Sequence, residues 1–232
     1  TYGTGCFILA QTGKEIVHSG NGLLSTIALQ LNGNRHYAVE GSIFVTGAGI
    51  QWLRDMLGFI ESAAETEELA KSVPGTNGVY IVPAFAGLGA PYWKPDARGL
   101  MTGLSRGTTK AEIVRAMLES VAYQTNDLIR ALKEDGVMIH EIKVDGGMTA
   151  NDWLCQFIAD IVDTRLIRPQ NLETTALGAA ALAGVQAGLI DGLEGIKTLT
   201  RPDREFSPQI KQNIRQNYLE GWHKAVRQTM TG

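Results

Sequence analysis

Hydrophobic and polar residues alternate over short stretches in the first forty positions of the chain. This pattern predicts strands at residues 6–10, 16–17, 25–29 and 37–39. Turn sequences separate these strands, namely Thr12-Gly13, Gly20-Asn21-Gly22 and Asn32-Gly33. Strands joined by such tight turns predict an antiparallel meander.

From about residue 44 the apolar residues recur every three or four positions, which is typical of helices with one buried face. The expected helices are 44–60, 62–71, 110–133, 151–162 and 176–187, followed by a C-terminal helical tail at 208–230. Strands are expected between them at 79–82, 141–145 and 165–168. A meander followed by alternating helices and strands predicts one α/β domain with a mixed sheet. We expect Tyr218 and Trp222 to pack the tail against this domain.

Charge and cysteine content narrow the class of protein. The chain carries 21 Lys and Arg against 24 Asp and Glu, a net charge of −3, which lacks the basic excess that nucleic acids or anionic membranes attract. The cysteines, Cys6 and Cys155, form neither a disulfide framework nor a zinc motif, so a reducing cytoplasm is expected. No apolar run of about 18 residues predicts membrane insertion. The chain opens at Thr1 in turn-rich sequence, so we expect it to be part of a longer protein.

Glycine is the unusual component. The chain has 27 glycines, about 12 % of its residues, against an average near 7 %. The hydrophobic content of 44 % and the lack of a collagen repeat exclude fibrous and disordered proteins. The excess therefore indicates many tight turns, or backbone that closely approaches another group.

Three glycine segments are candidates for binding a phosphate or a nucleotide. In residues 1–7 (TYGTGCF), exposed backbone N–H groups and the Thr4 hydroxyl suit a phosphoryl group, and a plain hairpin turn is the alternative. Residues 46–51 (TGAGIQ) open a helix whose N–H groups suit an anion, and close helix packing is the alternative. Residues 144–151 (VDGGMTAN) join a strand to a helix through two glycines. There, a base or ribose fits the glycines and Asn151 suits an adenine edge, with helix capping by Asn151 or Thr149 as the alternative.

Other chemistry is less well supported by the sequence. Residues 103–107 (GLSRG) match the nucleophile elbow of hydrolases, but the preceding residues do not form a buried strand and no oxyanion-hole motif is present. A serine hydrolase using Ser105 is therefore a minor alternative. The four histidines lack metal-ligand spacing, so no metal ligand is predicted, and no Walker motif occurs.

Taken together, these segments resemble the C-terminal, nucleotide-binding domain of the glycerol kinase family, among the sugar and polyol kinases of the actin-like ATPase superfamily. Residues 1–7 resemble the second phosphate loop, 80–106 the central block, 99–119 the second signature, and 144–151 the adenosine motif. Residues 173–180 (ETTALGAA) are similar to the family as well. The resemblance covers nearly the whole chain and implies a ribonuclease H-like α/β domain with a mixed five-stranded sheet flanked by helices.

The resemblance also implies an activity and a set of binding residues. The activity is ATP- and Mg²⁺-dependent phosphoryl transfer to glycerol, giving sn-glycerol 3-phosphate and ADP for glycerol uptake and catabolism, in a cleft between two domains. The implied nucleotide residues are Thr4 at the phosphates, Gly47 and Gln51 between phosphate and ribose, and Gly147 and Asn151 at the adenosine, with Ala63 as a weaker adenine-side candidate.

The same resemblance places other parts of the enzyme outside this chain. The general base, the metal-associated carboxylate and the polyol pocket are expected before Thr1, so this chain alone is expected to be inactive. A homo-oligomer is expected for the full-length enzyme. Two alternatives stay open: another sugar kinase of the same family, and a non-catalytic, actin-like nucleotide-binding module that acts through partner contacts.

Overall fold

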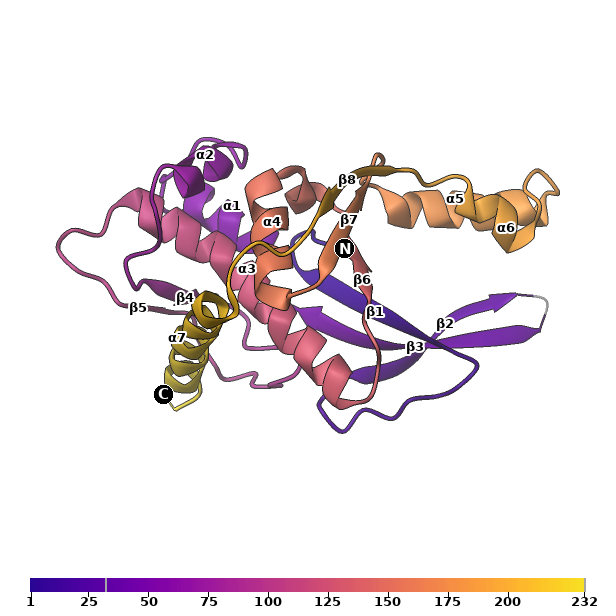
Figure 1. The fold of residues 1–232 in the computed structure, drawn as a ribbon, viewed down its shortest axis with the longest axis horizontal. Coiled ribbons are helices and arrows are strands. Elements are labelled where there is room, and N and C mark those ends of the chain that lie inside the picture. The colour runs from indigo at the N-terminus through magenta and orange to yellow at the C-terminus, as the bar shows by residue number, and fades with distance from the viewer. Residues whose placement is uncertain (32, 232) are drawn as a thin grey trace.

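The computed structural model describes residues 1–31 and 33–231. One long helix, α3 (Lys110–Glu134), runs through the middle of the fold and packs against α1, α2, α4 and α7 (Figure 1). A capping box fixes where α3 begins. The Thr109 side chain accepts from Ala111 N–H at 3.3 Å, and the Glu112 carboxylate accepts from Thr109 N–H at 2.9 Å. Burial on most sides explains why α3 carries apolar residues beyond a single stripe.

The predicted meander is confirmed. Strands β1 (Cys6–Gly13), β2 (Leu24–Leu31) and β3 (Asn34–Ile43) form an antiparallel sheet in the order β1-β3-β2. The strand expected at 16–17 is wrong, since these residues belong to the irregular connection between β1 and β2. The turn expected at Asn32-Gly33 rests in part on Asn32, which lies outside the described residues, whereas Gly33 has the positive φ of +79° that a tight turn requires.

Two further sheets follow. Strands β4 (Tyr80–Val82) and β5 (Leu100–Thr102) pair antiparallel. Strands β6 (Glu141–Lys143) and β7 (Arg165–Pro169) are parallel neighbours, and helix α4 (Asp152–Val162) lies in the connection between them. Strand β8 (Pro202–Phe206) pairs antiparallel with β7. β8 was not predicted from the sequence.

The strands that the structure describes therefore form ladders of three, two and three strands rather than one five-stranded sheet. β6 has three residues and pairs with β7 alone. Contact between the two larger sheets comes from the N-terminal segment, where Tyr2 N–H donates to Asp145 O at 2.7 Å. The α/β class is as expected, whereas a continuous five-stranded ladder is not seen.

The remaining helices are α1 (Gly47–Asp55), α2 (Glu65–Lys71), the 3₁₀ helix η1 (Gly147–Ala150), α5 (Thr174–Gln186), α6 (Gly192–Lys197) and α7 (Gln212–Met230). α5 and α6 form a pair that extends away from the sheets (Figure 1). The prediction that Trp222 and Tyr218 dock the tail is confirmed, because Trp222 is fully buried and both rings pack on Tyr123 of α3. Within the described residues no helix combines the length and apolar character needed to cross a membrane.

Candidate functional site

A cavity of about 510 Å³ opens where α1, α2, η1 and the N-terminal segment meet. Its lining includes all five predicted nucleotide residues and the weaker candidate, namely Thr4, Gly47, Gln51, Gly147, Asn151 and Ala63. Segments that are far apart in the sequence thus converge on one site. The binding roles of these residues stay predictions.

The N-terminal segment is fastened to the start of α1. Gly47 N–H donates to Gly3 O and Ala48 N–H to Thr4 O, each at 3.0 Å, and the Thr46 hydroxyl donates to Gly3 O at 2.9 Å. The sequence left two alternatives open for this helix start, N–H groups free for an anion or close packing. The structure shows close packing at Gly47 and Ala48, because carbonyl groups of the same chain accept from their N–H groups. Thr4 itself has an exposed side chain at the cavity.

At two of the glycines predicted to approach a ligand, the direction of a Cβ atom points at the protein's own backbone. A Cβ atom on Gly47 would lie 2.5 Å from Gly3 O. One on Gly146, where φ is +91°, would lie 2.5 Å from Tyr2 O. Gly147 differs, because a Cβ there would meet no atom within 4 Å. Of these three glycines, Gly147 is the one that leaves room for a ligand.

Asn151 serves as the N-cap of α4, which confirms the structural alternative weighed from the sequence. Its Oδ1 atom accepts from Leu154 N–H at 2.8 Å. Its Nδ2 atom donates to the Thr66 hydroxyl of α2 at 3.3 Å. An amide nitrogen carries two hydrogens, so a second donor remains for a ligand in the cavity. Capping and ligand binding are therefore compatible at this residue.

The α2 wall of the cavity is ordered by a carboxylate at the start of that helix. Glu65 Oε1 accepts from Ser62 N–H at 2.7 Å and from Glu61 N–H at 2.9 Å. Donation, chiefly from Ser62 N–H, holds the pKa of Glu65 below its ordinary value. These bonds fix the bend that carries Ala63 and Ala64 to the cavity.

Sequence reasoning missed most of the apolar lining and two charged residues. The missed residues are Ile50, Arg54, Ala64, Thr66, Glu67, Leu118, Met148, Ala150 and Leu154. Helical spacing was a usable signal for Arg54, which lies one turn after Gln51 and therefore on the same side of α1. Buried Ile50, Leu118 and Leu154 give the cavity an apolar floor, which suits a flat ring.

The other candidate groups lie elsewhere. Ser105 is exposed in a turn, where its hydroxyl lies 3.4 Å from that of Thr108 and accepts from Gly107 N–H at 3.3 Å. Hydrogen bonds between the described residues join Ser105 to no histidine, so the hydrolase alternative gains no support. His223 is not a plain surface residue, because its Nε2 atom lies 3.0 Å from the buried Asp127 carboxylate.

An α/β domain with a cavity where several glycine segments meet belongs to the class of ligand-binding domains, and its family can be stated. Residues 1–187 match the C-terminal domain of the FGGY family of carbohydrate kinases. The chain belongs to this family.

The relatives within the family point further. The glycerol kinase of Gluconobacter oxydans is 53 % identical over 232 residues, which are all of this chain and 45 % of that protein. The crystal structure of Plasmodium falciparum glycerol kinase with ADP matches 99 % of this chain and 46 % of that chain, with a TM-score of 0.90 and 39 % identity. Gluconate kinase from Lactobacillus acidophilus shares the fold, at a TM-score of 0.80 and 22 % identity. The chain spans about half the length of the curated relatives it matches.

Proposed function

We propose that this chain is the ATP-binding half of a glycerol kinase, which transfers the γ-phosphoryl group of ATP to glycerol and releases sn-glycerol 3-phosphate and ADP. The observation that carries the proposal is the convergence of Thr4, Gly47, Gln51, Gly147 and Asn151 on one cavity. Support also comes from the 53 % identity to a glycerol kinase and from the match to a glycerol kinase solved with ADP.

The cavity offers a different kind of contact to each part of a nucleotide. The open face of Gly147 admits a flat ring system, and the apolar floor excludes water from it. The second N–H of Asn151 Nδ2 is left for the base, and Gln51 of α1 lines the same cavity. The exposed Thr4 hydroxyl is the donor for the phosphates. Phosphoryl transfer depends mainly on positioning and electrostatic stabilisation. A domain that only binds ATP and orients its phosphates would therefore contribute directly to the reaction.

The remaining parts of the reaction are assigned to the rest of the full-length protein. In the proposal an N-terminal domain supplies the general base, the polyol pocket and the protein ligands of Mg²⁺, an ion that would neutralise phosphate charge. Among residues 1–31 and 33–231, no three His, Cys, Asp or Glu side chains are grouped so that they would hold a metal ion. The full-length enzyme would act in the cytoplasm, as a homo-oligomer.

We also infer that the domain has the ribonuclease H-like arrangement of the actin-like ATPases, with β1-β3-β2 and β6-β7 as one five-stranded platform. The bond from Tyr2 N–H to Asp145 O is the point at which these two sheets would join. A shorter gap between β1 and β6 in the structure of the full-length protein would support this inference.

The direct test is a substrate panel with the full-length protein. We expect ATP-dependent phosphorylation of glycerol, with much weaker turnover of gluconate, xylulose and other polyols. The isolated chain is expected to bind ATP weakly and to phosphorylate nothing. Preference for another sugar would favour the sister kinases of the family, and ATP binding without turnover of any polyol would favour a non-catalytic module. Robust glycerol phosphorylation by the isolated 232 residues would contradict the assignment of the base to another domain.

A further inference from the structure

The 3₁₀ helix η1 forms one wall of the cavity, and hydrogen bonds hold its first residues in place. Gly146 N–H donates to Leu172 O at 3.0 Å. Met148 N–H donates to Tyr2 O at 3.3 Å. These bonds fix where the turn begins, but they leave its last residues and the start of α4 to be held by other groups.

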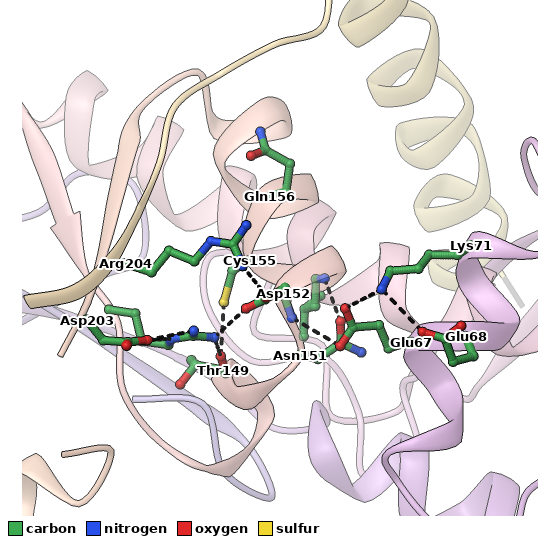
Figure 2. Close-up of polar contacts among 12 residues, drawn as sticks. Glu67, Glu68, Lys71, Thr149, Asn151, Asp152, Cys155, Gln156, Asp203 and Arg204 are labelled. Carbon is green, nitrogen blue, oxygen red and sulfur yellow. Dashed lines mark hydrogen bonds and ion pairs between the residues drawn. The ribbon is translucent and has the colours of Figure 1, made fainter. Parts of the chain in front are cut away.

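Arg168 of β7 holds that second end. Its side chain is 12 % exposed, and its Nη1 atom lies 2.8 Å from Thr149 O and 2.7 Å from Asp152 Oδ1. Thr149 and Asp152 lie together at the start of α4 (Figure 2). Another donor to Thr149 O is the Cys155 thiol at 3.3 Å, and burial raises the pKa of this thiol to about 12, so it remains a weak neutral donor. Arg168 is therefore the strong donor at this end of the turn.

The rest of the guanidinium is oriented by β8. Arg168 Nε and Nη2 lie 3.0 and 2.7 Å from Asp203 Oδ2, and its Cζ atom lies 5.5 Å from the centre of the Phe206 ring. A guanidinium is planar and donates in fixed directions, so contacts on its outer edge aim its inner edge at the turn. Arg168 is not among the residues that line the cavity.

We infer that Arg168 is a positioning residue for the nucleotide site, because it binds Thr149 O and Asp152 Oδ1. These two bonds set the positions of Asn151, which lies between Thr149 and Asp152, and of Gly147, which lies two residues before Thr149. Both Gly147 and Asn151 line the cavity. The nature of the ligand, a nucleoside triphosphate, rests on the proposed function. The restraint on the turn rests on the contacts of Arg168 alone.

The same network contains a matched control residue. Arg204 pairs with the other oxygen of Asp152, but its side chain is 55 % exposed, and among residues 1–31 and 33–231 it contacts Asp152 and the Phe206 ring rather than the turn. Arg204→Ala removes one cation from Asp152 and keeps the bond from Arg168 to Thr149 O. Arg168→Lys keeps the charge, but an ammonium group cannot reproduce a planar fork directed at a carbonyl and two carboxylates.

The first measurement is ATP affinity and steady-state kinetics in the full-length protein. For Arg168→Ala we expect a roughly tenfold rise in the Kd and KM for ATP, as for loss of one hydrogen bond to a charged group, with little change in kcat or in the KM for glycerol. Arg168→Lys is expected to fall between this variant and the wild type, and Arg204→Ala to stay within about twofold of the wild type. If Arg168→Ala does not fold, the comparison of Arg168→Lys with Arg204→Ala decides the outcome.

The second measurement is amide hydrogen exchange at residues 147–151 without nucleotide, which reports opening of the turn directly. We expect faster exchange there in Arg168→Lys and Arg168→Ala than in Arg204→Ala. Unchanged exchange and affinity in both Arg168 variants would overturn the inference, as would an equal effect of Arg204→Ala. Failure of the wild-type protein to bind ATP would contradict the proposed function instead, and the exchange data would still decide whether Arg168 holds the turn.

Discussion

At the scale of single residues, two glycines of the same cavity are required for opposite reasons. Gly47 is close to the carbonyl of Gly3, so even a methyl group at this position displaces backbone. Gly147 has open space where a side chain would be. Gly47 therefore allows the close backbone packing that forms the site, and Gly147 leaves space for a ligand.

Substitutions should separate these two roles. We expect Gly147→Val to weaken ATP binding by tenfold or more while moving the melting temperature little, because the new side chain occupies the cavity. Gly47→Ala should lower the free energy of unfolding by about 1–3 kcal/mol, the usual cost of overpacking. Calorimetry and thermal melts measure both effects. Gly75→Val is the control, because a Cβ there also meets open space and Gly75 does not line the cavity.

Asn151 allows capping and ligand binding to be measured apart. Asn151→Asp keeps an oxygen that caps Leu154 N–H but loses the amide donor, so we expect near-normal stability with reduced ATP affinity. Asn151→Ala loses the cap as well and should cost about 1 kcal/mol of stability. Normal ATP affinity in the Asp variant would show that the side chain only caps the helix.

At the scale of elements, helix ends with strong caps were the most predictable parts of the chain. α3 was expected at 110–133 and is Lys110–Glu134, and α4 was expected at 151–162 and is Asp152–Val162. Thr109 and Asn151 mark both starts, because a local hydrogen bond decides where each helix begins. β8 has the sequence PDREF, exposed except for Phe206, and carries no such local signal, since only its pairing with β7 makes it a strand.

The cap of α3 gives a prediction on pH. The Thr109 hydroxyl, followed by its backbone N–H, donates to Glu112 and lowers the pKa of this carboxyl. A carboxyl with a lowered pKa contributes stability that is complete above the ordinary Glu value, about 4.3, and is lost as pH falls through the folded-state value. The wild type should thus melt higher than Glu112→Gln at pH 6 to 7.

The difference between these two proteins should shrink steadily below about pH 4. Thermal melts between pH 3 and 7 measure it, and Glu68→Gln, at an exposed position of α2, is the control expected to show little change. A difference that is constant across this range would mean that the charge of Glu112 is not part of the cap.

The residues of the candidate site also differ in whether a local sequence signal predicts them. The glycines of the site, together with Thr4 and Asn151, were predicted because they stand in short motifs. Leu118 and Leu154 read as ordinary core residues of helices, and only the packing of α3 and α4 brings them to the cavity floor. Whether N–H groups at the start of α1 are free depends on a segment far away in the sequence, which no local pattern reports.

At the scale of the whole molecule, a buried carboxylate ties the C-terminal helix to the rest. Asp127 of α3 is 1 % exposed and accepts from Trp222 Nε1 at 2.7 Å and from the Tyr92 hydroxyl at 2.8 Å. His223 of α7 lies 3.0 Å from its other oxygen. A buried carboxylate is stable only while such partners remain, so α7 and the loop that carries Tyr92 depend on each other.

Trp222→Phe keeps an aromatic ring and removes its donor. We expect a loss of about 1–3 kcal/mol in the free energy of unfolding, the cost of leaving a buried acceptor short of one partner. Urea titration of this variant, of Asp127→Asn and of the double variant forms a cycle that isolates the coupling. Simple additivity of the two losses would contradict a shared network.

The hydrogen bonds that hold the N-terminal segment also limit the order in which parts of the molecule can fold. Tyr2 N–H donates to Asp145 O and Tyr2 O accepts from Met148 N–H, so the cavity wall joins residue 2 to residues that are synthesised much later. Contacts between distant segments form late in folding, because a long loop must close first. During synthesis on a ribosome, the cavity cannot form until residues 145–151 have emerged, even though β1 to β3 are made earlier. A ligand that binds the completed cavity would then stabilise the folded state by mass action.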